Sequence, residues 1–403
     1  LMLYVHMAVL LNELFFPKTD PFTASLLTAL SFCATFVFRP FGALIFGSIG
    51  DKIGRKVPII LATGLMAVSC FTMASLPTYA QIGITASWIM LGCRMLQGLS
   101  SMGEIVGSEV YLTETISGLK RNPAVAFLSA CSAIGSFAAL GIAKITLSNE
   151  FNWRIAFFIG GIIALISVLI RVSLNETREF SDAKQRLKNT LKEFNIKKNT
   201  LKNHQILKTS NKSAVIYFLM LCSGPLWFYI IYILCASVLR NSFGFTIEEV
   251  ISHNLIIASS GMLMMFFWTY LSLRIPPLKI LKFKLYIFVA FIITCFIYSL
   301  FFEITVGTML LFQVVANIFE PRIFPAVAVF YKKFPTLKRF RSATFASAMS
   351  RLLTYTITSF GAIFLIKWFG NYGLLIFIIP SLVLYFYGLN YFNRLEYDKN
   401  IIE

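Results

Sequence analysis

Charge is scarce in this sequence. Only 13% of its 403 residues are charged, while 57% are hydrophobic, and a soluble domain carries roughly twice that charged fraction. Histidine is also rare, with only His6, His204 and His253 in the whole chain, and the sequence shows no nucleophile and base pair and no phosphate-binding loop. The low charge excludes a soluble globule, and the missing catalytic groups argue against an enzyme. The composition therefore predicts an integral membrane protein.

Acidic side chains are half as frequent as basic ones, with 18 Asp and Glu against 36 Lys and Arg and a net charge of +18. The basic residues gather in hydrophilic segments that follow alternate apolar runs, at 52–56, 120–121, 176–212, 274–284, 332–341 and after 394. The intervening loops carry few: Lys18, Lys144, Arg154, Arg240 and Lys367. This asymmetry follows the positive-inside rule, so both termini are expected in the cytoplasm of a cell whose inner membrane holds the chain. Anionic lipid suffices as a partner for the basic charge, and no nucleic acid is expected.

Cysteine is absent from the polar loops, because all seven cysteines fall within apolar segments. This placement indicates neither a disulfide framework nor a metal site. A buried cysteine behaves as a small hydrophobic residue. No cofactor is therefore expected.

Long apolar runs are abundant, and they predict an all-α integral membrane protein. Runs that can cross roughly 30 Å of hydrocarbon lie near residues 22–48, 57–77, 82–112, 122–147, 153–175, 213–239, 250–273, 284–303, 306–330, 342–367 and 371–391. The stretch before Pro17 is too short to span and is interpreted as the second half of a further helix; it lacks the basic start and the cleavage site of a signal peptide. The hydrophilic segment 176–212 is interpreted as a cytoplasmic linker between an N-terminal unit, 1–175, and a C-terminal unit, 213–403.

The most specific motif is the turn from Gly47 to Lys56, with the pattern G-x-x-x-D-x-x-G-R-K. Gly47 and Gly54 permit close backbone approach and a sharp reversal. Asp51 offers a carboxylate suited to a helix N-terminus, and Arg55 and Lys56 fall where hydrocarbon gives way to headgroups. A basic turn that only retains a helix end would explain Arg55 and Lys56, but it would not explain Asp51 or the glycines.

This turn, with the preceding RPFG, resembles the signature loop between helices 2 and 3 of the major facilitator superfamily, and in particular of its metabolite:proton symporter family, which includes the proline/betaine transporters. The resemblance implies a major facilitator fold of two six-helix bundles, twelve helices with the first truncated. It also implies that Asp51 lies near the start of the segment 342–367. Conformational gating is accordingly assigned to Gly47, Asp51, Gly54, Arg55 and Lys56.

Polar side chains line one stripe of the segment 82–112. At about 100° per residue, a stripe roughly 80° wide contains Arg94, Gln97, Ser101, Glu104 and Ser108. The pattern R-x-x-Q-G followed by G-E resembles a motif of the same family. The resemblance implies that Arg94 lies in the translocation cavity and that Glu104 takes part in substrate or proton coupling. The alternative is a set of buried charges that only fixes packing.

The second half repeats this arrangement. On the segment 306–330, Glu320 shares a helix face with Gln313 and Asn317, and Arg322 is expected to point away from it. Arg351 lies on the polar face of the segment 342–367. A cavity with an arginine and a glutamate from each half would suit a small zwitterion or carboxylate, so Arg94, Gln97, Glu104, Glu320 and Arg351 are the expected substrate-binding or coupling residues.

The predicted function is secondary active transport by a monomer, with proton-coupled uptake of a small zwitterionic osmolyte, proline or glycine betaine. A dicarboxylate such as 2-oxoglutarate is the alternative substrate, since it also presents a carboxylate to an arginine. The family's acidic and aromatic cluster would lie just before the position that matches Tyr4, and this sequence begins too late to contain it. The second alternative is therefore a non-transporting remnant, and proton-driven accumulation is expected to be weak without a further N-terminal segment.

Overall fold

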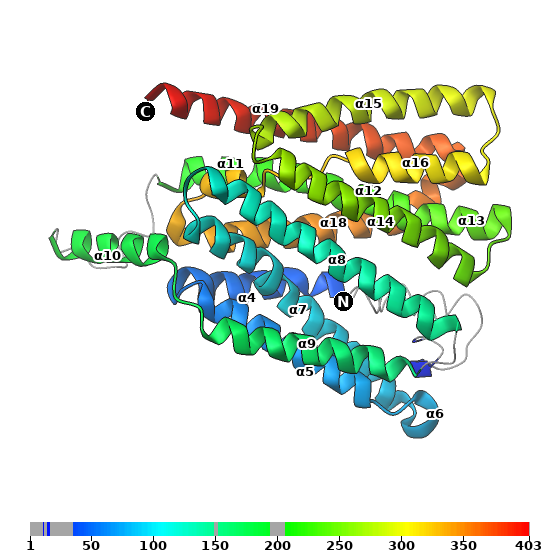
Figure 1. Cartoon of the computed structure of the whole chain (residues 1–403), viewed down its shortest axis with the longest axis horizontal. Helices are drawn as coiled ribbons and strands as arrows, with labels where there is room; N and C mark the ends of the chain where they lie inside the picture. The colour runs from blue at the N-terminus through cyan, green and yellow to red at the C-terminus, as the bar shows by residue number, and fades with distance from the viewer. Residues whose placement is uncertain (1–10, 12–13, 17–34, 149–151, 194–205, 403) are drawn as a thin grey trace.

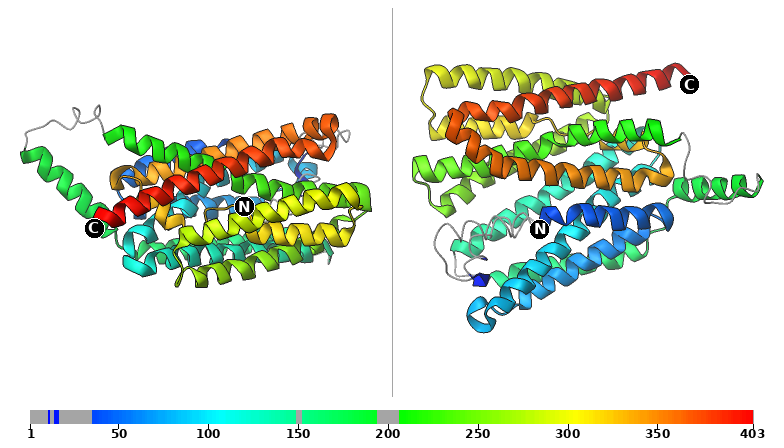
Figure 2. Two further views of the ribbon diagram at one scale, coloured as in Figure 1. Left: turned by 90° about the horizontal axis from the view of Figure 1, so that it is seen from above. Right: turned by 180° about the vertical axis from the view of Figure 1, so that it is seen from behind.

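The computed structural model describes residues 11, 14–16, 35–148, 152–193 and 206–402, and within these ranges every regular element is a helix. Long helices lie side by side in an elongated bundle (Figure 1). One amphipathic helix, α10 (Arg178–Glu193), projects from one end of the bundle in every view (Figures 1 and 2). We call this end the α10 end.

The N-terminal set of helices consists of α4 (Arg39–Lys52), α5 (Lys56–Ser75), α6 (Tyr79–Ile82), α7 (Ile84–Thr115), η1 (Gly118–Lys120), α8 (Arg121–Ser148) and α9 (Trp153–Val172). Helix α5 packs against α7 and α9, and α4 packs against α7. The α4 and α7 backbones approach closely, because a Cβ atom on Gly42 would lie 2.0 Å from the carbonyl oxygen of Leu99. Small residues permit such contacts between membrane helices.

The C-terminal set consists of α11 (Ile206–Leu221), α12 (Ser223–Phe228), η3 (Tyr229–Leu234), α13 (Cys235–Phe243), α14 (Ile247–Leu271), α15 (Pro277–Phe301), α16 (Val306–Phe319), α17 (Val327–Lys332), α18 (Thr336–Phe369), η4 (Gly370–Leu374) and α19 (Leu375–Ile402). The η3 segment is a π-helical turn that continues α12 into α13. The extra residue of a π turn displaces backbone carbonyls from the α-helical pattern, and the Gln313 side chain donates to one of them, Ile231 O, at 2.6 Å.

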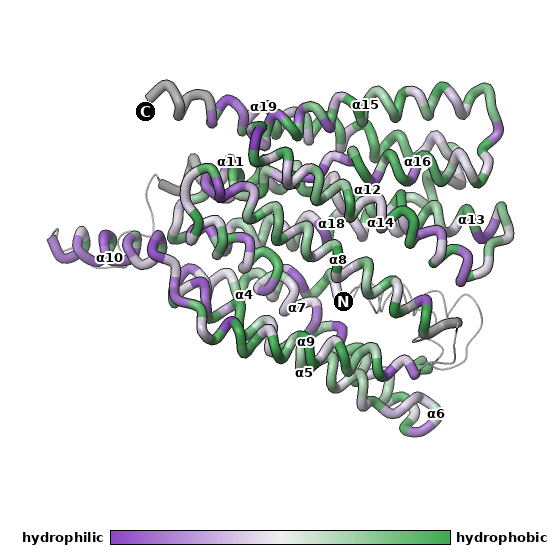
Figure 3. Tube along the Cα trace, in the orientation of Figure 1, coloured by the Kyte–Doolittle hydropathy of each residue, from purple (hydrophilic) through white to green (hydrophobic). Residues whose placement is uncertain are grey.

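Seven helices of the described chain are long and apolar enough to cross a membrane. They lie within Lys56–Ser75, Gly118–Ile142, Trp153–Val172, Lys212–Phe243, Ile247–Leu271, Pro277–Phe301 and Tyr372–Glu396. Hydrophobic residues follow the lengths of the bundled helices, whereas α10 is hydrophilic (Figure 3). Helices α7 and α18 are as long but are not among the seven. Both carry buried polar residues, including Arg94 and Ser350, which lower their mean hydropathy.

These observations confirm the all-helical membrane fold. The division at residues 176–212 stays a prediction, with α10 lying inside that segment. The proposed half helix before Pro17 lies largely outside the described residues. Of its described members, Leu11 and Phe15 are buried, and the Phe15 ring packs edge-on against Trp153 at 5.4 Å.

The expected helix over 306–330 is interrupted, which corrects the prediction. Helix α16 ends at Phe319, and Glu320 has an extended backbone, with φ −45° and ψ 145°. The chain then runs without helix to α17, which begins at Val327. Pro321 and Pro325 both remove a backbone donor. Because the helix is broken, Arg322 does not point away from Glu320, and instead the two form an ion pair.

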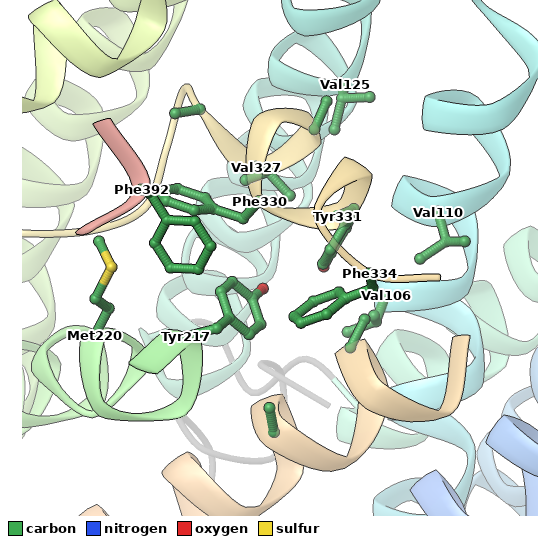
Figure 4. Close-up of a cluster of buried hydrophobic side chains, with 14 of the residues drawn as sticks. Val106, Val110, Val125, Tyr217, Met220, Val327, Phe330, Tyr331, Phe334 and Phe392 are labelled. Carbon is green, nitrogen blue, oxygen red and sulfur yellow. The ribbon is translucent and has the colours of Figure 1, made fainter. Parts of the chain in front are cut away.

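The two sets meet along α4 with α18 and α8 with α14, and α17 of the C-terminal set contacts α7 and α8. A hydrophobic cluster joins the sets beside α17 (Figure 4). Tyr217, Tyr331 and Phe334 come from the C-terminal set, and Val106 and Val110 come from α7. Because all five are buried, this cluster holds the sets together near the α10 end.

Candidate functional site

The signature turn joins the two sets of helices. The Asp51 carboxylate accepts hydrogen bonds from the amides of Phe340 at 3.1 Å and Arg341 at 3.0 Å, in the second turn of α18. A Cβ atom on Gly47 would lie 2.9 Å from the Cα of Arg341, so only glycine permits this approach of α4 to α18. Asp51 thus lies near the start of the helix, as the resemblance implied, while its gating role stays a prediction.

Arg55 is fully buried beside this turn, and its guanidinium contacts several partners. Its Nε and Nη2 donate to the two carboxylate oxygens of Glu114, each at 2.9 Å. Its Nη1 donates to Asp51 Oδ1 at 3.1 Å, and the group lies 4.5 Å from the ring centroid of Phe180. The two parallel bonds form the fork geometry in which arginine binds a carboxylate strongly.

Glu114 extends this contact into the C-terminal set. Its Oε1 accepts a hydrogen bond from Arg339 Nη1 at 2.8 Å, and the same nitrogen donates to Glu179 on α10 at 2.8 Å. Glu179 also pairs with Lys332 at 2.5 Å. We call Asp51, Arg55, Glu114, Glu179, Lys332 and Arg339 the ion-pair cluster. It ties both sets and α10 together at the α10 end.

Glu179 lies on α10, outside the membrane-spanning segments. Partial burial acts to raise its pKa, but the hydrogen bond from Lys332 and the charge of Arg339 outweigh burial, and the pKa lies below its usual value of 4.5. The carboxylate is therefore ionised at neutral pH and holds α10 against α17 and α18.

Gly54 and Glu176 shape the start of α5. Gly54 has φ +148°, and a Cβ atom there would lie 2.0 Å from Glu176 Oε2. The Glu176 carboxylate accepts hydrogen bonds from the amides of Arg55 at 2.8 Å and Lys56 at 3.3 Å. It thereby satisfies free amides at a helix N-terminus, where negative charge is favourable.

A cavity of about 270 Å³ lies between the two sets of helices, and we call it the Arg351 cavity. Its chemically distinctive lining residues are Glu109 and Ser129 from the N-terminal set and Tyr217, Phe228, Arg322, Tyr331, Arg351 and Tyr355 from the C-terminal set. Arg351 Nη1 donates to Ser347 O at 3.3 Å. In the described chain no carboxylate lies within ion-pair distance of Arg351, so its guanidinium is available to a ligand.

Glu109 contributes a carboxyl group to the same cavity. Its Oε2 accepts a hydrogen bond from the Tyr331 hydroxyl at 2.7 Å, and its Oε1 accepts one from the Ser129 hydroxyl at 3.3 Å. The Phe228 and Tyr355 rings meet edge to face, with centroids 6.2 Å apart. The cavity thus combines a guanidinium, a carboxylate and aromatic faces.

A second cavity, of about 200 Å³, adjoins the first, and we call it the Glu320 cavity. The two share lining residues: Ser129, Phe228, Arg322 and Phe324. Glu320 is 2% exposed and pairs with Arg322, and its Oε2 lacks a hydrogen-bond partner among the described residues. Lys284, also buried, lines the same cavity. Arg322 therefore stands between the two cavities.

The other expected site residues lie elsewhere. Arg94 is fully buried and its Nη1 donates to Gln97 Oε1 at 2.8 Å, while Gln97 Nε2 contacts the sulfur of Met73 on α5 at 3.3 Å. Glu104 pairs with Arg171 on α9 at 3.5 Å. None of Arg94, Gln97 and Glu104 is among the described residues that line the two cavities. The structure brings Arg351 and Glu320 into adjoining cavities, and the roles of all five stay predictions.

Sequence reasoning missed Glu109, Tyr331 and Lys284. An acidic residue inside a membrane helix marks a functional site by default, and this signal could have singled out Glu109. Tyr331 carried no such signal, because its position depends on the break between α16 and α17.

The comparisons with known proteins agree with the helical membrane fold. The family model of the Major Facilitator Superfamily matches residues 2–354. The chain belongs to the major facilitator superfamily. It is therefore a multi-pass membrane protein of a transporter family, which confirms the resemblance drawn from the sequence.

Several relatives are named as proline/betaine transporters. The chain is 34% identical to the proline/betaine transporter of Salmonella typhimurium over 188 residues, which cover 44% of this chain and 37% of that protein. It is 33% identical to the Escherichia coli protein of the same name over 184 residues, again 44% and 37%. The matched part thus spans less than half the length of these relatives.

Solved structures share the fold. A double tryptophan mutant of XylE superposes with a TM-score of 0.74 over 96% of this chain and 90% of that chain, at 14% identity. The proton:xylose symporter XylE bound to a halogenated glucose has a TM-score of 0.71 with the same coverage and identity. At this identity the likeness concerns the fold.

Proposed function

We propose that the protein is a proton-coupled importer of a small zwitterion, with proline and glycine betaine as the first candidates. It would lie in the inner membrane of a bacterium, with the α10 end in the cytoplasm. The Arg351 cavity is the observation that carries this proposal. It lies between the two sets of helices, where transporters of this architecture bind substrate near the membrane midplane. The basic segments at 52–56, 176–212 and 332–341 support a cytoplasmic α10 end.

Arg351 is the residue that would bind the carboxylate of the substrate. It lines the cavity, and its described polar contacts are to the Ser347 carbonyl at 3.3 Å and the Met102 sulfur at 4.0 Å. A guanidinium that is not neutralised by a protein carboxylate in a desolvated site binds a ligand carboxylate strongly, and its planar fork matches both oxygens.

The aromatic residues would receive the cationic end of the substrate. Phe228 and Tyr355 both line the cavity, and Phe228 also packs against Tyr232 with ring centroids 5.2 Å apart. A quaternary ammonium has no hydrogen to donate, and proteins bind such groups through aromatic faces. This combination favours a zwitterion over a dicarboxylate, because the second carboxylate of 2-oxoglutarate would meet the negative faces of these rings and Glu109.

The proposal is tested by reconstituting the 403-residue chain in lipid vesicles with an imposed proton gradient, acidic outside. Labelled proline, glycine betaine and 2-oxoglutarate are supplied separately. We expect uphill uptake of proline or glycine betaine that collapses when a protonophore is added. Uptake of 2-oxoglutarate alone would mean that the substrate is a dicarboxylate and not a zwitterion. Uptake that follows a sodium gradient would mean that sodium, and not the proton, is the coupling ion.

Empty vesicles and the Arg351→Ala variant serve as controls. If the wild-type chain, correctly inserted, neither accumulates nor exchanges any of the three compounds, the transport proposal is wrong for this sequence.

A further inference from the structure

Glu109 differs from Glu104, Glu114 and Glu320 in its partners. Glu104 pairs with Arg171, Glu114 with Arg55 and Arg339, and Glu320 with Arg322. Within the described chain, Glu109 has no basic group within 4.0 Å and is held by two hydroxyls instead.

Hydroxyl partners suit a group that changes its protonation state. An ionised carboxylate accepts from both hydroxyls, and a neutral carboxyl can still bond to them because a hydroxyl both donates and accepts. Protonating Glu114, in contrast, would leave the buried guanidiniums of Arg55 and Arg339 without their shared carboxylate, and protonating Glu320 would remove the ion-pair partner of Arg322. Glu109 is therefore the membrane carboxylate that takes up a proton with the least disruption.

Tyr331 connects Glu109 to the opposite set of helices. Its hydroxyl donates to Glu109 Oε2 at 2.7 Å, while its backbone oxygen accepts from Arg339 Nε at 3.0 Å. Arg339 belongs to the ion-pair cluster, and Lys332, the next residue of α17, pairs with Glu179 in the same cluster. One residue of α17 thus touches both the cavity carboxylate and the contacts that close the α10 end.

We propose that Glu109 binds the coupled proton and that its hydrogen bond to Tyr331 transmits the protonation state to the closure of the α10 end. This inference rests on the proposed proton-coupled transport. The ionised carboxylate makes a charge-assisted bond that draws α17 onto α7. The neutral carboxyl makes a weaker bond, and a proton that binds from the far side of the membrane therefore favours opening at the α10 end.

The other ionisable groups around Glu109 modulate this equilibrium. Arg351 and Arg322 line the same cavity as Glu109, and Tyr217 and Tyr331 from α11 and α17 present hydroxyls there. From α8, the facing group is the neutral Ser129. A substrate carboxylate on Arg351 would offset one positive charge and so favour protonation of Glu109, which couples the two binding events.

Vesicle transport distinguishes the coupling step from substrate binding. A gradient of about two pH units supports up to ~100-fold accumulation per proton. We expect Glu109→Gln to lose this accumulation while proline or glycine betaine exchange, in the absence of a gradient, remains measurable. Glu303→Gln, a matched change at an exposed loop residue, should leave both activities unchanged.

Two further variants sharpen the test. Glu109→Asp retains a protonatable group and should recover part of the accumulation. Tyr331→Phe keeps Glu109 but removes the bond between the sets, and should lower accumulation while exchange persists. Wild-type accumulation in Glu109→Gln would overturn the proposal. So would a loss of exchange together with accumulation, because it would place Glu109 in substrate binding.

A substrate-free measurement separates this inference from the proposed substrate. Dyes on Leu119→Cys and Lys338→Cys, two exposed positions on opposite sets near the α10 end, report the separation of the sets by energy transfer in a chain whose native cysteines are replaced. We expect a pH-dependent separation that Glu109→Gln abolishes. An unchanged pH profile in Glu109→Gln would refute the coupling role even if no transported substrate were found.

Discussion

The ion-pair cluster and the Arg351 cavity both bring charged side chains of the two sets together, but the partners of these side chains differ. In the cluster, Glu114 is fully buried and meets two guanidiniums, each at 2.8 to 2.9 Å. In the cavity, Glu109 and Arg351 border an open volume and are held by hydroxyl, carbonyl and sulfur groups. Side chains that are fully paired with opposite charges hold one arrangement of the helices. Charged side chains without such a partner can respond to a ligand or a proton.

Removing the centre of the cluster tests the first half of this comparison and should have the largest effect. Glu114→Ala leaves Arg55 and Arg339 buried without their shared carboxylate, and breaking such a pair typically costs about 3–5 kcal/mol. We expect a large fall in the melting temperature of the purified protein, with separation of the two sets at the α10 end.

Glu248→Ala is the matched control, since Glu248 is exposed at the start of α14. Equal melting temperatures for the two variants would mean that the cluster does not hold the sets together.

Replacing Arg351 tests the second half of the comparison, which concerns the Arg351 cavity. Arg351→Lys keeps the charge but loses the planar fork, and we expect substrate affinity to fall by roughly 2 kcal/mol or more, which is about 30-fold. The half-saturation concentration for uptake measures this change, with membrane expression as the control.

Arg94→Lys refines the position of the substrate. Arg94 is held by Gln97 and lies among residues outside both cavities, yet the sequence resemblance places it in the translocation pathway. A loss of affinity as large as that of Arg351→Lys would show that both arginines bind substrate. A small loss would confine the carboxylate to Arg351.

A neutral substitution in the signature turn should act more weakly. Asp51→Asn keeps the shape but removes the negative charge that two amides of α18 share. A carboxylate near a helix N-terminus contributes about 0.3–2 kcal/mol, so we expect a severalfold shift away from the state closed at the α10 end, without unfolding. Cysteine accessibility from the two sides measures the shift, and identical accessibility in both proteins would contradict it.

Acidification should weaken the ion pairs of Glu179, and we expect this to have the smallest effect on stability of the changes considered. The pKa of Glu179 is lower in the folded protein than its usual value of 4.5. Its contribution is therefore present above that value and is lost as pH falls through the lowered pKa. The difference in melting temperature between wild type and Glu179→Gln should shrink as the pH falls from about 5 to about 3. A difference in melting temperature that grows on acidification would contradict a lowered pKa of Glu179 in the folded protein.

The sequence predicted those parts of the site that depend on a local pattern of residues. Asp51 and its glycines were singled out from spacing, and the structure places Asp51 at α18. The stripe with Arg94 and Glu104 was also recognised, but helical periodicity says which residues share a face and not which neighbour that face meets. In the folded chain these residues contact α5 and α9. The ion pair between Glu320 and Arg322 was missed because the periodicity argument kept both residues on one helix, kinked at Pro321, whereas the helix ends at Phe319.

The sequence by itself determined the all-helical membrane class, the charge asymmetry of the loops and the superfamily, because hydropathy, loop charge and a strained turn are local properties of the chain. Only the tertiary structure decided which charges meet. It brought Glu109 and Tyr331 together across 222 positions of sequence, and it gave Glu114 two arginines. Such contacts depend on the packing of α17 and α18 against α7, and the energy of a buried charge depends on the partners that this packing supplies.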